Sequence, residues 1–392
     1  MKRTISIFCT GLVVRLVALL YLVHVKPYML TWGANEAAGI AGWIVRNHSF
    51  SSPFHDASGP TAWLAPIYPA VVAAVFWVFG IATQGSAIAV MIFNSICSAA
   101  AGVIIYMIAA DVHSERAGVF AAWMWALCPY VAILPFIPWD TSLSALLLSA
   151  ALLLTLRLHS GKSERWAECG ILWGVAALVS PTLFIGFPII ALLLLERGSR
   201  IRQVVIMTLF AFVLLLPWTV RNYFAFHQIL PIRSNGLAEV YFANCGFETH
   251  PVGPSMEYQR LGEAKFIAQV NSRALKYIRT NPAIFIGDCL RRAMWFWIYP
   301  ISFWPLSVVI DLAALAGIIL LFRHSRQTAM LMLVVIAAYP LVYYASLNQS
   351  RYRHPIEPIL YALGGIGLSE LALRRRWSLG NTGKVSSATP SF

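Results

Sequence analysis

Charged residues are scarce in this sequence. Only 11% of its 392 residues are Asp, Glu, Lys or Arg, whereas 59% are hydrophobic and the mean hydropathy is +0.70. Soluble globular proteins carry about 25% charged residues, so the composition excludes that class. Several apolar runs are about 17 to 25 residues long, the length of a helix that crosses a bilayer. The sequence therefore predicts an all-α fold, a polytopic transmembrane helical bundle.

Cysteine is also scarce, and its six positions are scattered. Four cysteines lie within apolar runs and are interpreted as small core residues. Cys245 and Cys289 share a later polar region, where the alternatives are a disulfide and two free thiols. No cysteine–histidine spacing has the form of a zinc site. The sequence thus requires no cofactor, and it leaves a divalent metal open.

Basic residues outnumber acidic ones and give a formal net charge of +13. No basic face is interleaved with aromatic residues for stacking on bases, so no nucleic-acid partner is predicted. The basic residues instead form short clusters beside apolar runs, which is typical of cytoplasmic loops in membrane proteins. The clusters that this rule assigns to the cytoplasm are 2–3, 163–165, 197–202, 323–326 and 374–376, joined by the loop 111–116.

The apolar runs predict a single membrane domain over residues 1–373, with roughly ten to thirteen helical passes. The first run has no small-residue cleavage site and is interpreted as a retained helix. Residues 374–392 are predicted to be a disordered cytoplasmic tail. The predicted helices are 4–25, 63–80, 87–110, 117–134, 141–158, 167–195 (broken at Ser180-Pro181), 204–220, 304–322, 329–347 and 356–373. The segments placed outside the cytoplasm are 26–62, 135–140, 221–303 and 348–355.

The first external loop, residues 26–62, carries the acid Glu36 at the start of a short helical pattern. Asn35 is a suitable N-cap for an interfacial helix that runs to about Arg46. The helix dipole favours an ionised carboxylate in this first turn by roughly 0.3–1 kcal/mol. Glu36 is therefore a candidate general base at the boundary between water and bilayer. The alternative is an acid that only stabilises the start of the helix.

Asp140 is the second candidate acid, because it precedes a predicted helix on the same side of the membrane as Glu36. The two acids could divide the roles of base and of positioning or metal-binding group. The alternative for Asp140 is again an N-cap.

Four external arginines are candidates for binding a phosphate, which a guanidinium contacts with two parallel N–H groups. Arg351 and Arg353 stand in a short external loop, where the positive-inside rule disfavours them. A strand-like loop would place both of their side chains on one face. Arg233 precedes a Ser-Asn-Gly turn, and Arg221 ends an apolar run. The alternative is that these side chains extend to lipid headgroups.

An ordered set of motifs resembles the C-type (GT-C) membrane glycosyltransferases. The similar branch is the dolichyl-phosphate-mannose protein mannosyltransferases (glycosyltransferase family 39-like), with their bacterial aminoarabinose and core-sugar transferases. The set covers residues 1–370 and reads WGANEAAGIA, GPTAWLAPIYP, IPWDTSLSALL, GILWGVAALVSPT, LLPWTVRNY, LPIRSNG and SRYRHP. Many relatives have an Asp-Glu pair in the first loop, whereas this sequence has Asn35 before Glu36.

This resemblance implies a multi-pass enzyme of a bacterial inner or cell membrane whose active site faces away from the cytoplasm. It implies transfer of a sugar, with inversion, from a polyprenyl-phosphate-linked donor to a lipid, glycan or protein acceptor. It places the catalytic acids at Glu36 and Asp140. Arg221, Arg233, Arg351 and Arg353 are then expected to bind the donor phosphate.

Two other classes remain as alternatives. A polytopic transporter, or a lipid or glycan flippase, predicts ionisable residues at mid-bilayer and pseudo-symmetric halves. This sequence has few charges within its predicted helices, chiefly Arg15, and no internal repeat. A structural or assembly protein has no need of Glu36 and Asp140.

Overall fold

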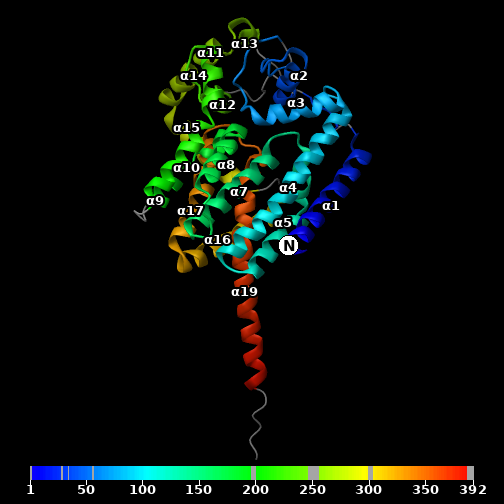
Figure 1. Ribbon diagram of the computed structural model, residues 1–392, viewed down its shortest axis with the longest axis vertical. Helices are drawn as coiled ribbons and strands as arrows, with labels where there is room; N and C mark the ends of the chain where they lie inside the picture. Colours follow the sequence, from blue (N-terminus) through cyan, green and yellow to red (C-terminus); the bar gives the residue numbers. More distant parts are fainter. Residues whose placement is uncertain are drawn as a thin grey trace, which may run out of the picture.

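The protein is a bundle of helices capped at one end by shorter helices (Figure 1). The computed structural model describes residues 2–27, 30–33, 35–54, 57–195, 200–245, 256–298 and 303–385. Within these ranges every named element is a helix, and the one β-bridge joins Ser51 to Pro60. The all-α fold predicted from composition is therefore confirmed. The polar residues His55 and Asp56 of the first loop lie outside the described residues.

The elements follow one another along the chain with short connections. The first half contains α1 (Lys2–Val25), α2 (Glu36–Asn47), α3 (Ile67–Phe79), α4 (Gln84–Val112), α5 (Glu115–Leu127), α6 (Pro129–Ile133), η2 (Leu134–Phe136), α7 (Thr141–His159), α8 (Trp166–Val179), η3 (Pro181–Phe184) and α9 (Phe187–Leu195). The second half contains α10 (Ile201–Val213), α11 (Leu216–Phe226), α12 (Gly236–Asn244), α13 (Met256–Leu261), α14 (Glu263–Thr280), α15 (Pro282–Phe296), α16 (Trp304–His324), α17 (Arg326–Ala338), α18 (Leu341–Ala345), η5 (Ser350–Ile356) and α19 (Glu357–Val385).

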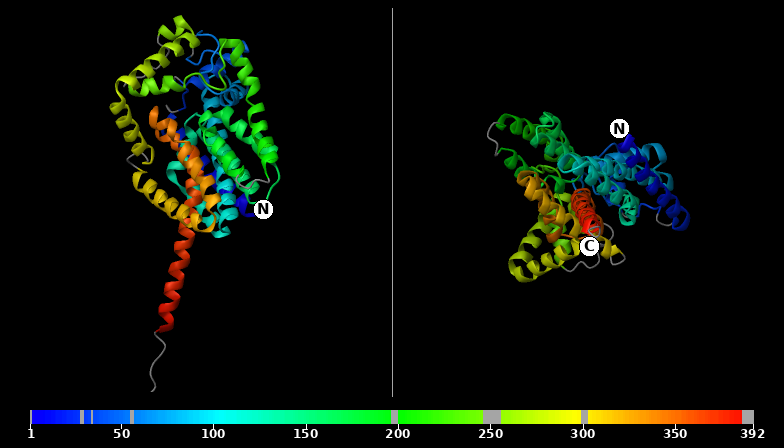
Figure 2. Two further views of the ribbon diagram at one scale, coloured as in Figure 1. Left: turned by 90° about the vertical axis from the view of Figure 1, so that its left-hand side faces the viewer. Right: turned by 90° about the horizontal axis from the view of Figure 1, so that it is seen from below.

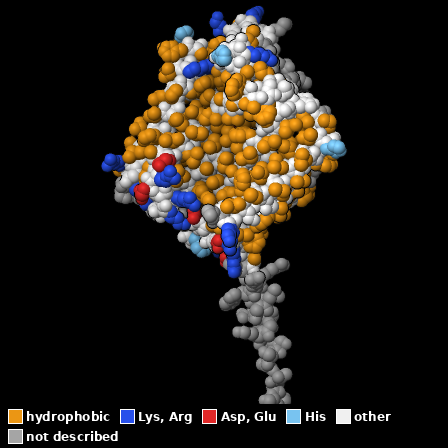
Figure 3. Space-filling view, turned by 45° about the vertical axis from the view of Figure 1, so that its right-hand side comes forward, with side chains coloured by type: hydrophobic (Ala, Val, Ile, Leu, Met, Phe, Trp, Pro, Cys, Tyr) orange, Lys and Arg blue, Asp and Glu red, His pale blue; other side chains and the backbone are white. Residues whose placement is uncertain are grey.

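The described helices make this an integral, multi-pass membrane protein. Six helical segments are long and apolar enough to cross a bilayer, or seven if the bent pair of α5 with α6 and η2 is one span. Figure 3 shows a broad apolar face, with Lys and Arg side chains towards its two ends. A bilayer solvates such a face at no cost, whereas water does not.

The prediction of ten to thirteen passes exceeds the number of helices long enough to span. The reason is that several apolar runs break into shorter helices at proline, which lacks the backbone N–H and clashes with the preceding turn. The run 117–134 bends by 56° between Leu127 and Pro129. The break predicted at Ser180-Pro181 is confirmed, since α8 ends at Val179 and η3 begins at Pro181.

The helix ends assigned to the cytoplasm gather at one end of the bundle. Arg3 of α1 forms an ion pair with Glu115 of α5, and Asp111 of α4 forms one with Arg157 of α7 at 2.7 Å. Helix α19 leaves the bundle at this same end and continues to Val385 (Figure 1). The first part of the predicted disordered tail is therefore helical.

The opposite end carries α2, α12, α13 and α14, which cap the bundle (Figures 1 and 2). These elements come from the two predicted external regions, 26–62 and 221–303. An aromatic cluster joins them, because Phe54 of the first region and Trp63, one residue beyond that region, contact Tyr258 of the second with ring centroids 5.1 and 5.9 Å apart. Cys245 and Cys289 of the later region are free thiols, so the disulfide alternative is wrong.

Candidate active site

A cavity of about 770 Å³ lies where the capping helices meet the bundle. Its wall combines side chains from the first loop, the start of α7, helix α12 and the segment η5. Both predicted acids and two of the four predicted arginines line it, and so do two further acids and one further arginine. The charged residues of the lining are Glu36, Asp140, Arg233, Glu239, Glu257, Arg273 and Arg351, and of these Glu257 and Arg273 pair with each other at 3.1 Å.

Glu36 stands in the first turn of α2, as the sequence predicts. The side-chain oxygen of Asn35 accepts a hydrogen bond from the backbone N–H of Ala38 at 3.0 Å and so caps the helix. Its amide nitrogen also donates to the carbonyl of Pro138, at 3.0 Å. An aspartate carboxylate could not donate this second bond. Asn35 therefore both starts the helix that carries Glu36 and fastens it to the segment that precedes Asp140.

Asp140 immediately precedes α7, but its side chain makes no capping hydrogen bond. Asp140 therefore occupies the N-cap position without capping the helix through its side chain. The loop before it is held from below by Asn94 of α4, whose buried amide lies 3.2 Å from the carbonyls of both Pro135 and Ile137. This contact fixes the loop and leaves the Asp140 carboxylate to face the cavity.

Burial dominates the electrostatics of three of these acids. Desolvation raises the pKa of Glu36, Asp140 and Glu239 above the ordinary values, while Arg233 and Arg351 both act to lower them. For Glu36 the removal of water is the largest effect and raises the pKa, while a hydrogen bond with its own backbone N–H lowers it. A raised pKa brings a carboxyl closer to the range in which it can exchange protons at neutral pH.

Arg233 and Arg351 are the two arginines of the cavity wall without a carboxylate partner among the described residues, whereas Arg273 pairs with Glu257. Among the residues that the structure describes, no carboxylate lies within ion-pairing distance of either. Arg233 Nε donates to the Trp63 carbonyl at 2.9 Å, which orients the guanidinium. The guanidinium carbon of Arg351 lies 4.3 Å from the ring centroid of Trp139, and its Nε is buried without a hydrogen-bond partner. Both cations therefore retain N–H groups for an anion.

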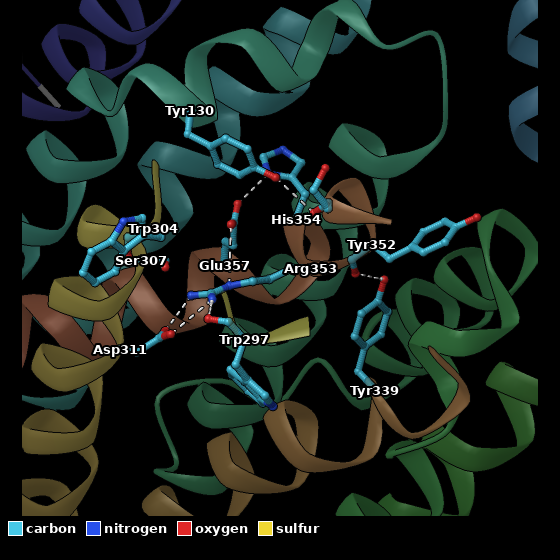
Figure 4. A network of polar contacts seen from close by, with 11 residues as sticks. Tyr130, Trp297, Trp304, Ser307, Asp311, Tyr339, Tyr352, Arg353, His354 and Glu357 are labelled. Carbon is cyan, nitrogen blue, oxygen red and sulfur yellow. Dashed lines mark hydrogen bonds and ion pairs between the residues drawn. The ribbon is translucent and has the colours of Figure 1, made fainter. Parts of the chain in front are cut away.

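The other two arginines lie outside the cavity lining. Arg221 donates to the carbonyls of Phe50 and Thr61, at 2.6 and 2.7 Å, and so clamps the first loop. Arg353 is 2% exposed and pairs with Asp311 of α16 (Figure 4). Their predicted place beside a donor phosphate does not agree with these contacts.

The expectation that Arg351 and Arg353 share a face is also wrong, because η5 is a 3₁₀ helix rather than a strand. With three residues per turn, positions i and i+2 lie about 240° apart around the axis. One side chain therefore enters the cavity while the other enters the bundle.

Sequence reasoning did not single out two further carboxylates, Glu239 in the cavity wall and Glu263 behind it. Glu239 follows Arg233 by less than two helical turns and accepts a hydrogen bond from Asn235 at 2.8 Å. Glu263 is 3% exposed and accepts bonds from Ala62 N–H at 2.7 Å and Ser234 Oγ at 2.8 Å. The sequence feature that indicates a buried Glu263 is its place in register with the buried apolar positions of α14.

Glu263 lies behind the cavity wall and holds segments of it together through hydrogen bonds. It also accepts hydrogen bonds from Thr61 Oγ1 and from Tyr258 OH. Its carboxylate therefore joins the first loop to the segment that follows α11. Two of the bonded residues, Ala62 and Ser234, are the chain neighbours of Trp63 and Arg233 in the cavity wall. Four donors on one buried carboxylate compensate for the loss of water around it.

The described residues include no group of three or more His, Cys, Asp or Glu side chains placed to hold a metal ion. The divalent metal left open by the sequence thus lacks a ligand set of that size in these parts of the chain, and no step proposed below passes through a metal.

Residues 64–220 match the family model described as dolichyl-phosphate-mannose-protein mannosyltransferase. No curated protein matches the sequence.

Among solved structures, the Archaeoglobus fulgidus oligosaccharyltransferase in its apo form is similar, with a TM-score of 0.55 and 14% identity over 99% of this chain and 53% of that one. The same archaeal enzyme, AglB, in complex with an inhibitory peptide and a dolichol-phosphate gives 0.53 and 15% over 99% and 52%. ArnT from Cupriavidus metallidurans bound to undecaprenyl phosphate gives 0.53 and 14% over 94% and 60%.

The chain spans about half the length of the archaeal enzyme, and at this identity the similarity concerns the fold. The resemblance predicted from the ordered motifs is confirmed: the segment 64–220 is similar to the dolichyl-phosphate-mannose-protein mannosyltransferases, and the whole chain shares its fold with AglB and ArnT.

Proposed function

We propose that this protein is a membrane glycosyltransferase that takes a sugar from a polyprenyl-phosphate-linked donor and transfers it to an acceptor outside the cytoplasm. The observation that carries the proposal is the composition of one cavity wall. Three desolvated carboxyls face the same space as two arginines that form no ion pair with a described residue. Proton transfer and phosphate binding are the two demands of this reaction, and the wall holds groups for both.

In the proposed reaction, the acceptor hydroxyl attacks the anomeric carbon of the donor. The new C–O bond forms as the bond between that carbon and the phosphate oxygen breaks, which inverts the anomeric centre. The hydroxyl proton passes to Glu36, whose raised pKa suits a base that works near neutral pH. The polyprenyl phosphate leaves with its added negative charge facing Arg233 and Arg351, whose positions are set before the reaction begins.

The cavity also has an apolar side that suits a lipid carrier. Ile185 and Val342 line it beside the aromatic ring of Tyr343, on the side of the bundle helices. Contact with an isoprenoid chain there would be stabilised by about 25 cal/mol per Å² of apolar surface removed from water. The fold neighbours bound to undecaprenyl phosphate and to a dolichol-phosphate support a carrier of this chemical class.

A transfer assay on the reconstituted protein tests the proposal. Nanodiscs containing the protein would receive undecaprenyl-phosphate-linked hexoses or pentoses and a membrane extract as the source of acceptors. Mass spectrometry should show release of undecaprenyl phosphate together with a glycosylated product. The matched control is Asp140→Asn, which keeps the side-chain shape and removes the charge. Movement of intact donor between leaflets, without loss of its sugar, would instead support the flippase alternative.

A further inference from the structure

The segment η5 carries Arg351 into the cavity and is anchored on the residues at either side of it. The carbonyl of Ser350 accepts a hydrogen bond from Tyr130 OH at 3.1 Å. The carbonyl of Tyr352 accepts one from Tyr339 OH at 2.9 Å. Figure 4 shows both tyrosines approaching the segment from different elements of the bundle. The backbone that carries Arg351 is therefore tied down on both sides.

The strongest anchor is the ion pair of the next residue, Arg353, whose side chain is 2% exposed and whose partner Asp311 is 27% exposed. The Arg353 guanidinium donates to Asp311 through Nη1 at 3.1 Å and through Nη2 at 2.5 Å, a two-bond contact between η5 and α16. Its Nη1 also donates to the Trp297 carbonyl at 2.5 Å. Glu357 adds a second carboxylate, with Oε1 3.8 Å from Arg353 Nε.

Arg353 and Glu357 have no access to substrate, because their side chains are 2% and 0% exposed. Buried charges are costly to desolvate, and an apolar packing of similar volume is often as stable. Stability alone therefore does not explain why these buried residues are charged. A two-bond contact from a planar guanidinium fixes orientation as well as distance.

Rotation of η5 links this contact to the cavity. In a 3₁₀ helix the side chains at positions i and i+2 point in different directions. When Arg353 is held towards α16, Arg351 therefore points towards Trp139, the residue before Asp140. Short 3₁₀ segments are weakly stable by themselves, so the direction of Arg351 depends on such external restraints.

We infer that Asp311, acting through Arg353, is a positioning residue that holds Arg351 in the cavity for contact with the donor phosphate. This inference rests on the proposed function, since it assigns Arg351 to a phosphate. It predicts that Asp311 matters to turnover only as long as Arg351 is present.

A double-mutant cycle separates this role from a general structural one. Steady-state transfer would be measured for wild type, Asp311→Asn, Arg351→Gln and the double variant. Asp311→Asn should lower kcat by about tenfold in the wild-type background and by less than about twofold in the Arg351→Gln background. An equal loss in both backgrounds would overturn the inference. If Asp311→Asn does not fold, Arg353→Lys takes its place, because lysine keeps the charge and loses the planar fork.

Hydrogen–deuterium exchange of the 350–356 segment gives a readout that needs no sugar transfer. Asp311→Asn should speed exchange there, whereas Asp288→Asn, which breaks the exposed 2.6 Å pair with Arg291, should not. If the wild type transfers no sugar yet Asp311→Asn releases the segment, the proposed function fails and the anchoring stands. A segment that stays protected in Asp311→Asn contradicts the anchoring itself.

Discussion

The four arginines that were all predicted to bind phosphate form two different pairs in the structure. Arg233 and Arg351 line the cavity and form no ion pair with a described residue, while Arg221 and Arg353 are occupied by carbonyls and carboxylates of the fold. The difference lies in their partners rather than in their distance along the chain, since Arg351 and Arg353 are two residues apart. A cation is available to a ligand only where the fold has not already used its N–H groups.

The same contrast separates the carboxylates. Glu263 accepts four hydrogen bonds and joins two loops. Glu36 is desolvated in the cavity, and its pKa is raised in consequence. Paired variants can compare a group that is bonded within the fold with a group that faces the cavity.

Arg353→Gln against Arg351→Gln gives the largest expected contrast. Loss of Arg353 leaves Asp311 without its partner inside the bundle, which should lower the free energy of unfolding by about 3–5 kcal/mol. Loss of Arg351 should leave it nearly unchanged. Denaturation of both variants in detergent, monitored by tryptophan fluorescence, measures the difference in their free energies of unfolding. Equal destabilisation would remove the distinction between the two pairs.

Glu36→Gln sharpens the contrast among the carboxylates. Transfer should fall by about 10²-fold or more, because the amide cannot take the acceptor proton. Burial raises the Glu36 pKa, so the folded state binds protons more tightly than the unfolded state and its stability falls as pH rises through that window. The variant should therefore melt above wild type at pH 7.5, and near pH 4 this gain should vanish.

The matched control for that variant is Glu115→Gln, at the other end of the bundle, which should retain full transfer. Wild-type turnover in Glu36→Gln would reject the general-base assignment.

Lysine substitution at the cavity arginines should have a smaller effect. Arg233→Lys and Arg351→Lys keep the charge but lose the planar fork, so each should lower kcat by about tenfold if contact with the phosphate strengthens as it leaves. Arg221→Lys should act on stability instead. Steady-state kinetics with an undecaprenyl-phosphate sugar decides this, and a rise in KM alone would mean that the arginines bind only the ground-state donor.

The smallest expected effect is a shift in the pH dependence. Arg351 lowers the pKa of Glu36, so its removal should raise that pKa further. The base must be ionised to act, and the acid limb of the residual kcat/KM profile of Arg351→Gln should accordingly move to higher pH. A limb at the wild-type position would place Arg351 too far from Glu36 to act on it.

Much of this arrangement follows from local sequence. Asn35 and Glu36 predict a capped helix from short-range chemistry alone, and α2 begins at Glu36. The break at Pro181 follows in the same way. Apolar length and composition predict the membrane bundle because a bilayer imposes both.

The remaining features depend on contacts between distant segments. Glu263 meets Thr61 across 202 positions, and Arg353 meets Asp311 across 42. No periodicity within either segment specifies such a partner. A strand would place Arg351 and Arg353 on one face, but the 3₁₀ geometry of η5 separates them.

Affinity for undecaprenyl phosphate tests the central claim most directly. Binding to the purified protein in nanodiscs would be measured for wild type, for Arg233→Gln/Arg351→Gln, and for Arg260→Gln, which changes an exposed arginine of α13 outside the cavity lining. The double variant should bind about 10- to 100-fold more weakly, the cost of losing charged hydrogen bonds to the phosphate, and Arg260→Gln should match wild type. Equal affinity in all three proteins would contradict the assignment of this cavity to a polyprenyl phosphate.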